Sequence, residues 1–140
     1  MGSSIGLFSK LKAPGWVAAA RDGQSFLITD TGNNRVIEIT GGQVSWKNEG
    51  LNLPRSATYA PNGNILIADT GNRRVIEVDR QGQIFWSFAR EMLAPVHAVR
   101  QDDGSTIITD AGYGRVIMVD ASGNPFWHFD GGVSDGAPPE

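Results

Sequence analysis

The chain has 140 residues with a formal net charge of -3; 40% of the residues are hydrophobic and 19% are charged. This length fits one domain with a substantial core, and the slightly acidic balance argues against nucleic acid or an anionic membrane surface as a partner. The chain contains no cysteine, which excludes disulfides, thiolate metal ligands and a cysteine nucleophile.

The N-terminal segment, residues 1–12, lacks the basic start and the apolar run of a secretory signal peptide. No apolar stretch approaches the roughly 20 residues that are needed to cross a bilayer, so no membrane partner is expected. The sequence leaves the compartment open, and the cytoplasm is the default expectation.

From residue 13 onward, each feature occurs three times at a spacing near 40 residues. Every copy begins with a proline that opens a short strand of small residues, and an Asp-Gly or Asn-Gly pair follows. Such pairs between apolar runs predict a tight hairpin in which both turn residues have positive φ. The prolines are Pro14, Pro54 and Pro95, and the strands are predicted at 16–20, 56–60 and 97–100.

The hairpin leads to a second strand that is apolar along its length, as expected for a strand covered on both faces. These strands are predicted at 26–30, 65–69 and 106–110. An Asp-x-Gly-x-x-Arg loop then reverses the chain into a third strand, and a fourth strand that carries a tryptophan follows another glycine turn. The third strands are predicted at 36–39, 75–78 and 116–119, and the tryptophans are Trp46, Trp86 and Trp127.

Four short strands in each of three copies predict an all-β fold of three four-stranded antiparallel blades, as in a β-propeller. The run Asn-Gly-Asn-Ile-Leu-Ile-Ala-Asp-Thr-Gly-Asn-Arg-Arg-Val-Ile-Glu-Val-Asp, residues 62–79, resembles the NHL repeat of six-bladed propellers. The third copy departs from that pattern at Tyr113 and Gly114. The expected blades cover about residues 13–52, 53–93 and 94–130, and a disordered tail is expected at 131–140.

Three blades leave two sheet faces without a neighbour, because propellers usually close with four to eight blades. With the six blades that the NHL resemblance implies, the count predicts a homodimer in which two chains complete one ring. A strand at 5–8 is then expected to clasp the edge of the partner's third blade. The alternative is that the chain is one half of a longer six-bladed protein.

Each Asp-x-Gly-x-x-Arg loop holds a carboxylate and a guanidinium at a fixed spacing. We interpret these pairs as loop-stabilising contacts, because a catalytic group seldom recurs identically in every blade. The pairs are Asp30 with Arg35, Asp69 with Arg74, and Asp110 with Arg115.

Residues that differ between the copies are the better candidates for ligand binding. Trp16, Arg55 and His97 follow shortly after the three prolines, and the repeat places them at one mouth of the central channel. Arginine would supply charge and tryptophan a stacking face for a peptide or a small anionic ligand. The alternative is a channel end that binds no ligand.

No catalytic residue, cofactor or metal site is predicted from this sequence. His97 and His128 are the only histidines, and two histidines alone make a poor metal site. The sequence also lacks a Gly-x-Ser-x-Gly elbow and a phosphate-binding loop. The first functional prediction is a non-enzymatic binding or scaffold module, and the alternative is a propeller hydrolase or lyase with an axial site.

Overall fold

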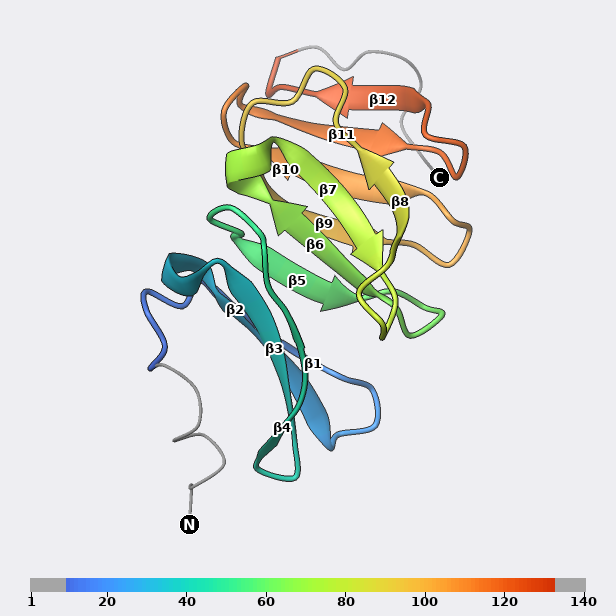
Figure 1. Cartoon of the computed structure of the whole chain (residues 1–140). Coiled ribbons are helices and arrows are strands. Elements are labelled where there is room, and N and C mark those ends of the chain that lie inside the picture. Colours follow the sequence, from blue (N-terminus) through green and yellow to red (C-terminus); the bar gives the residue numbers. More distant parts are fainter. Residues whose placement is uncertain (1–9, 133–140) are drawn as a thin grey trace.

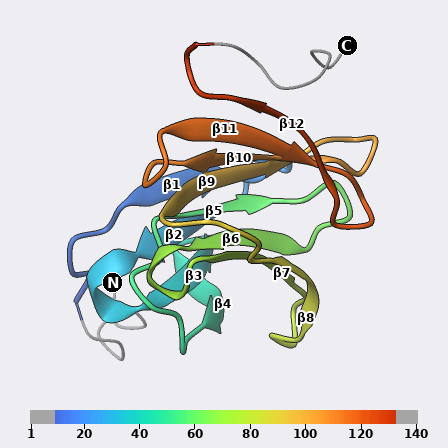
Figure 2. The same ribbon diagram turned by 90° about the horizontal axis from the view of Figure 1, so that it is seen from above.

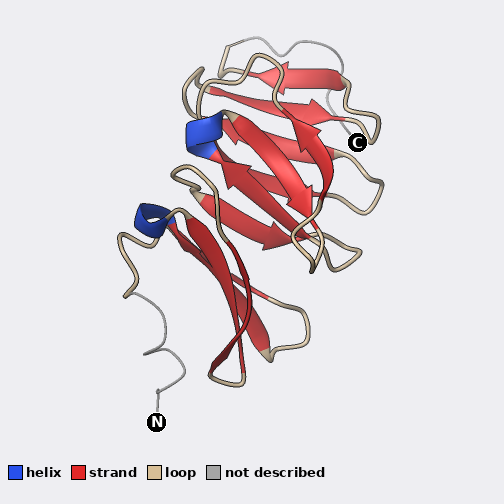
Figure 3. Ribbon diagram, viewed as in Figure 1, coloured by secondary structure: helices blue, strands red, loops and turns tan. Residues whose placement is uncertain are grey.

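The computed structural model describes residues 10–132, and these residues form three four-stranded antiparallel sheets, here called blades 1 to 3 (Figures 1 and 3). Blade 1 contains β1 (Trp16–Ala19), β2 (Ser25–Asp30), β3 (Arg35–Thr40) and β4 (Gln43–Asn48). Blade 2 contains β5 (Ser56–Tyr59), β6 (Ile65–Asp69), β7 (Arg74–Val78) and β8 (Ile84–Phe88). Blade 3 contains β9 (Pro95–Arg100), β10 (Thr106–Asp110), β11 (Arg115–Val119) and β12 (Pro125–Phe129). The predicted all-β class and the three blades are confirmed.

The strands of each blade lie side by side in sequence order, so the first strand is innermost and the fourth is outermost. The inner strand β5 packs against β1 and β2, and β9 packs against β5, β6 and β7. Seen from above, the inner strands gather near the centre while β4, β8 and β12 point to different sides (Figure 2). The three blades therefore fan out around one side of a central axis.

The second strands differ in burial although their sequences are alike. All five residues of β6 are buried, because blade 2 has a neighbour on each face. In β2 and β10, buried residues alternate with partly exposed ones over most of the strand. The expectation of strands covered on both faces thus holds within the described chain for blade 2 alone.

The first hairpin of each blade is built differently from the prediction. Gly23, Gly63 and Gly104 have φ values of 70°, 89° and 92°, whereas the Asp or Asn before each of them has no positive φ. The amide of Gly23 donates to the carbonyl of Ala20, and Asp22 Oδ1 accepts from the amides of Gln24 and Ser25. The loop is long enough for an ordinary turn followed by a left-handed glycine, so the aspartate need not be left-handed.

The Asp-x-Gly-x-x-Arg loops of blades 1 and 2 contain short 3-10 turns, η2 (Thr31–Asn33) and η3 (Thr70–Asn72). Each turn ends in a left-handed residue, Asn34 with φ 56° and Arg73 with φ 54°. Gly114 takes this position in blade 3 with φ 64°. The departure of the third copy from the repeat pattern therefore preserves the backbone shape of the loop.

Apolar side chains fill the two junctions between neighbouring blades. Trp46 is packed against the core between blades 1 and 2, and Trp86 against the core between blades 2 and 3. The buried residues of the first core include Leu27, Val36, Ile65 and Ile67, and those of the second include Leu66, Val75, Ile108 and Ile117.

Two predicted segments fall outside the part of the chain that the structure describes. They are the clasp strand at 5–8 and residues 133–140 of the predicted tail. Among residues 10–132, no helix is long and apolar enough to span a membrane.

Candidate functional site

The aspartates of the repeated loops are fully buried and hold together several parts of their own blade. Asp69 accepts hydrogen bonds from the amide of Asn52 at 2.8 Å, from Asn72 Nδ2 at 2.8 Å and from Arg74 Nε at 2.9 Å. Asp30 makes the equivalent bonds to the Lys12 amide, Asn33 and Arg35. Each carboxylate thus ties the segment entering its blade to the loop between the second and third strands.

The electrostatics of Asp30 agree with this arrangement. Burial alone would raise its pKa, but hydrogen bonds from the Lys12 amide, Asn33 and Arg35 outweigh burial and hold the pKa below its ordinary value. The carboxylate is therefore ionised and fully engaged. It is poorly suited to act as a general acid or base on a ligand.

The third pair is looser than the other two. Arg115 Nη2 lies 3.6 Å from Asp110 Oδ2 and donates to the carbonyl of Glu91. Like the other two aspartates, Asp110 accepts from the segment that enters its blade, here from the amides of Leu93 and Ala94. Asp110 thus still binds the segment that enters its blade, whereas Arg115 binds the carbonyl of Glu91 more closely than the aspartate.

The glycine of the motif lets the entering segment approach the loop closely. A Cβ placed on Gly71 would lie 2.5 Å from the carbonyl oxygen of Asn52, and the same holds for Gly32 and Lys12. The amide of Gly71 donates to that Asn52 carbonyl at 2.7 Å. No larger residue fits here without displacing the backbone.

Two of the three sequence-predicted binding residues are in contact. Trp16 at the start of β1 and His97 on β9 have ring centroids 4.3 Å apart with a tilt of 41°. Trp16 is 41% exposed, whereas His97 is half-buried and burial lowers its pKa. A neutral imidazole thus meets an accessible indole across the axis.

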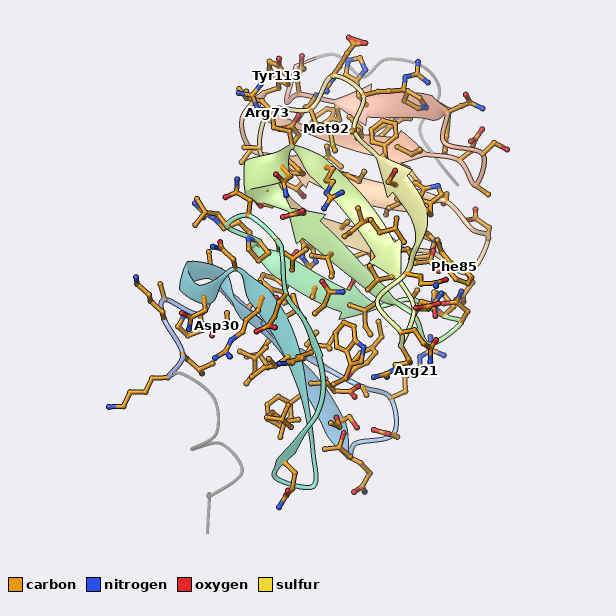
Figure 4. All side chains as sticks on the ribbon, in the orientation of Figure 1. Arg21, Asp30, Arg73, Phe85, Met92 and Tyr113 are labelled. Atoms are coloured by element: carbon orange, nitrogen blue, oxygen red, sulfur yellow. The ribbon has the colours of Figure 1, made fainter. Side chains whose placement is uncertain are left out.

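Arg55 lies on the same rim. It directly precedes β5, its side chain is exposed, and it forms no ion pair with residues 10–132. Its carbonyl oxygen is 3.3 Å from where a Cβ on Gly15 would lie, next to Trp16. All three predicted residues therefore lie at the end of the innermost strands that is next to the repeated loops. At this end, Figure 4 labels Asp30, Arg73 and Tyr113 in blades 1, 2 and 3.

Several buried polar atoms at this rim have no hydrogen-bond partner within the described chain. They are His97 Nδ1, Thr29 Oγ1 and Thr31 Oγ1. Thr29 pairs with Trp16 in the β1–β2 ladder, and Thr31 Oγ1 is 2.7 Å from where a Cβ on Gly15 would lie. Buried polar atoms without a protein partner commonly bind water or a ligand, so this rim can accept hydrogen-bonding groups.

At the opposite end of the innermost strands, a cavity of about 600 Å³ is lined by residues of all three blades. Glu38 is one of its lining residues and accepts from Arg80 at 2.7 and 3.0 Å, from Tyr59 Oη at 2.7 Å and from Ser45 Oγ at 2.8 Å. Burial would raise the Glu38 pKa, yet these hydrogen bonds lower it; burial and Glu38 together raise the pKa of Tyr59. Glu38 of blade 1 and Arg80 of blade 2 are therefore already paired across the junction between these blades.

The second junction repeats this arrangement with other partners. Glu77 accepts from Arg100 Nη1 at 2.8 Å and from the amide groups of Asn62 and Asn64. Sequence reasoning did not single out these junction glutamates, Glu38 and Glu77. The available signal was a glutamate in the same place of two otherwise apolar third strands, replaced by Met118 in the third.

Within residues 10–132, no group of three or more histidine, aspartate and glutamate side chains could hold a metal ion. His97 and the half-buried His128 lie on different strands of blade 3.

No family model matches the chain, and no curated protein matches its sequence. Among solved structures it is similar to hydrazine synthase from Kuenenia stuttgartiensis, with a TM-score of 0.70 and 15% identity over 84% of this chain and 35% of that one. A protein of unknown function from Bacteroides caccae gives a TM-score of 0.70 and 17% identity over 88% of this chain and 50% of that one. A catalytically inactive virginiamycin B lyase from Staphylococcus aureus, with quinupristin, gives a TM-score of 0.66 and 17% identity over 91% of this chain and 42% of that one.

The chain spans half or less of the length of these similar structures. With its three four-stranded sheets, the similarity decides the fold. The chain has a three-bladed, propeller-like fold. At these identities the likeness concerns architecture alone.

Proposed function

We propose that this protein is a non-enzymatic binding module that works as a six-bladed ring made from two copies of the chain. The ligand is a peptide or a small anionic group, and it binds at the channel mouth formed by Trp16, Arg55 and His97. Because a two-fold ring repeats each mouth residue, the complete mouth would contain two of each.

One observation carries this proposal. The exposed Trp16 contacts a half-buried His97 whose Nδ1 has no partner within residues 10–132, and the unpaired Arg55 lies on the same rim. An aromatic face, a neutral hydrogen-bonding ring and a free guanidinium suit a carboxylate with an adjoining apolar group. Elsewhere on the axis the arginines Arg80 and Arg100 are already paired with glutamates, which leaves them less able to attract an anion.

The test is a titration of the full chain with short peptides that carry either a free C-terminal carboxylate or an amide. Tryptophan fluorescence should change with the carboxylate peptides, and the change should be lost in W16F. R55Q should weaken binding by about tenfold or more, because a charge-assisted hydrogen bond contributes roughly 1.5–3 kcal/mol.

The matched control is R73Q, which removes an exposed arginine from the turn between η3 and β7, whereas Arg55 precedes the first strand of the same blade. It should leave the affinity unchanged. Equal affinity for the carboxylate and amide peptides, or equal weakening by R55Q and R73Q, would contradict the proposed mouth.

A lyase or hydrolase with an axial site is the second candidate, and the His97 ring is the observation that favours it. Burial lowers the pKa of His97, so the imidazole is neutral near pH 7 and could accept a proton. Quinupristin, named with the similar lyase structure, is a suitable probe. Its loss on incubation with the chain, abolished by H97A, would replace the binding proposal by catalysis.

A further inference from the structure

Two sheet faces at the ends of the half-ring carry apolar side chains and have no neighbouring blade among the described residues. On blade 1, Phe26, Ile28, Ile37, Ile39 and Val44 line a concavity of about 440 Å³. On blade 3, the residues packed against blade 2 are Ala98, Ile108, Ile117 and Val119. Side chains alternate along a strand, so the residues between them face away from blade 2.

The strand register defines one row of side chains on the outward face of each blade. In blade 1 the row is Ala18, Leu27, Glu38 and Trp46. In blade 2 it is Thr58, Leu66, Glu77 and Trp86. In blade 3 it is Val99, Ile107, Met118 and Trp127. The first two rows face the next blade along the chain. Their contacts therefore indicate which residues the third row should contact on a following blade.

At both junctions within the chain, the glutamate of the row binds a polar residue at one fixed place in the next blade. Glu38 binds Tyr59, and Glu77 binds Arg100. Tyr59 and Arg100 occupy the same register position, at the end of the innermost strand. The equivalent residue of blade 1 is Ala19, which pairs with Phe26 as Tyr59 pairs with Ile65.

The row of blade 3 lacks the glutamate of this polar contact, and blade 1 lacks the polar residue that would bind it. Met118 replaces the glutamate, and the exposed Ala19 replaces its tyrosine or arginine partner. A buried glutamate facing Ala19, or an arginine facing Met118, would cost free energy as an unpaired charge. An apolar residue on one face therefore matches a small apolar residue on the other.

The indole groups of the rows independently indicate that the row of blade 3 fits the surface of blade 1. Trp46 Nε1 donates to the carbonyl of Arg80, in the turn between β7 and β8 of the next blade, at 2.9 Å. Trp127 Nε1 is buried but has no acceptor within residues 10–132. The corresponding turn in blade 1 is Gly41-Gly42, which has backbone carbonyls and no side chains that would obstruct an indole.

We infer that the row Val99, Ile107, Met118 and Trp127 of one chain packs against blade 1 of a second copy, around Ala19, Phe26 and the Gly41-Gly42 turn. The two copies meet head to tail at two identical junctions, so the ring closes. This inference rests on the proposed two-chain ring and specifies its surfaces. It does not depend on the ligand bound at the channel mouth.

The first test measures the dimer dissociation constant of single variants by light scattering over a dilution series. V99E and A19R change exposed residues, so the chain should fold as the wild type does, as checked by circular dichroism. Each should weaken the dimer by at least about tenfold, because each places an unpaired charge in an apolar junction. F85E changes a 66% exposed residue on the outer strand of blade 2 and should leave the dimer unchanged.

The second test mixes two variants that each fail alone. M118E restores the glutamate of the row, and A19R restores its arginine partner on the other face. Met118 is 3% exposed in the single chain, so circular dichroism must first show that M118E folds as the wild type does. A mixed dimer of the two chains has one ion-paired junction and one wild-type junction, whereas each pure dimer has two unpaired charges. Native mass spectrometry should show the mixed dimer in clear excess over both pure dimers.

The outcomes separate this inference from the proposed function. A dimer that V99E and A19R leave intact, or mixing without preference for the mixed dimer, overturns the head-to-tail junction while peptide binding can still stand. A wild-type chain that remains monomeric overturns both the ring and the junction. Failure of peptide binding alone removes the mouth proposal, and the junction is then still supported by the mixing result.

Discussion

At the scale of single residues, the repeated Asp-x-Gly-x-x-Arg motif is explained by contacts inside one blade. The aspartate binds the amide of the entering segment, the glycine admits that segment at contact distance, and the arginine pairs with the aspartate. Because each blade must bind its own entering segment, the motif recurs with the blade. Its recurrence therefore points to architecture.

The first prediction concerns the aspartate of the central blade. D69N should lower the free energy of unfolding by about 3 kcal/mol, because Asp69 is fully buried and its charge satisfies Arg74. Urea denaturation measures the loss. E49Q removes one partner of the exposed pair with Lys47 and should hardly change the free energy of unfolding. A change beyond about 0.5 kcal/mol in E49Q would contradict the expected difference between the buried and the exposed pair.

The second prediction concerns close approach at the glycine. G71A should cost about 2 kcal/mol or more, since the added Cβ would lie 2.5 Å from the Asn52 carbonyl oxygen. In G132A the nearest neighbour is 3.5 Å away, so stability should hardly change. Thermal unfolding of the two variants checks the prediction, and equal melting temperatures would refute it.

At the scale of elements, the blades are joined by an apolar core and one buried glutamate at each junction. Burial would raise the pKa of both glutamates, but hydrogen bonds from Arg80, Tyr59 and Ser45 lower that of Glu38, and those from Asn64, Asn62 and Arg100 lower that of Glu77. The glutamates are thus charged in the folded chain. They link blades by accepting from side chains of the next blade.

The third prediction follows from the direction of these shifts. A glutamate in the unfolded chain has a pKa of about 4.3, and the folded value is lower, so the unfolded state binds protons first as the pH falls. The contribution to stability is complete above about pH 5 and is lost as the pH falls through the folded pKa. Denaturant unfolding between about pH 6 and pH 3 should show this decline, and E38Q should make it shallower. An unchanged slope in E38Q would mean that the glutamate does not link blade docking to protonation.

At the scale of the whole molecule, the central blade is the part that is covered on both sides. Every residue of β6 is buried, whereas exposed apolar side chains such as Phe26 and Val99 remain on the two outer faces. Such faces usually mark an interaction site when they are contiguous. Because the outer faces of blades 1 and 3 are uncovered in the described chain, we expect the stability of the protein to depend on further blades.

The fourth prediction tests that dependence directly. If two copies complete the ring, the melting temperature should rise with chain concentration, because association stabilises the folded state by mass action. Differential scanning calorimetry over a hundredfold dilution series measures the shift. A melting temperature independent of concentration would favour a folded half-ring whose outer faces are not joined by a second copy.

How far the sequence alone leads can be judged from particular residues. The spacing of Pro14, Pro54 and Pro95 and of the three tryptophans gave twelve strands and three blades, since a blade needs the same local signals each time. The hairpin prediction was wrong in detail, because the Asp-Gly pair sits in a longer loop where only glycine takes positive φ. Local pairs do not reveal loop length.

The candidate site was reached only in part. Trp16 and His97 each lie two residues after the proline of their copy, and Arg55 lies one residue after its own. This spacing predicted that all three lie at one mouth. The contact between the Trp16 and His97 rings could not be predicted, because it depends on the angle between blades 1 and 3. The contact of Glu38 with Arg80, a residue 42 positions away in sequence, depends in the same way on how blade 2 packs against blade 1.

The sequence by itself determined what is local and repeated: the strands, their order within a blade, the loop that each aspartate closes and the number of blades. Periodicity and turn chemistry act over a few residues, so they can be recognised in the sequence without knowledge of the tertiary structure. Only the tertiary structure decided which faces are covered, which polar atoms are left without partners and which residues meet across the axis. Those properties arise when whole sheets pack, and the free energy of that packing depends on side chains that are distant in sequence.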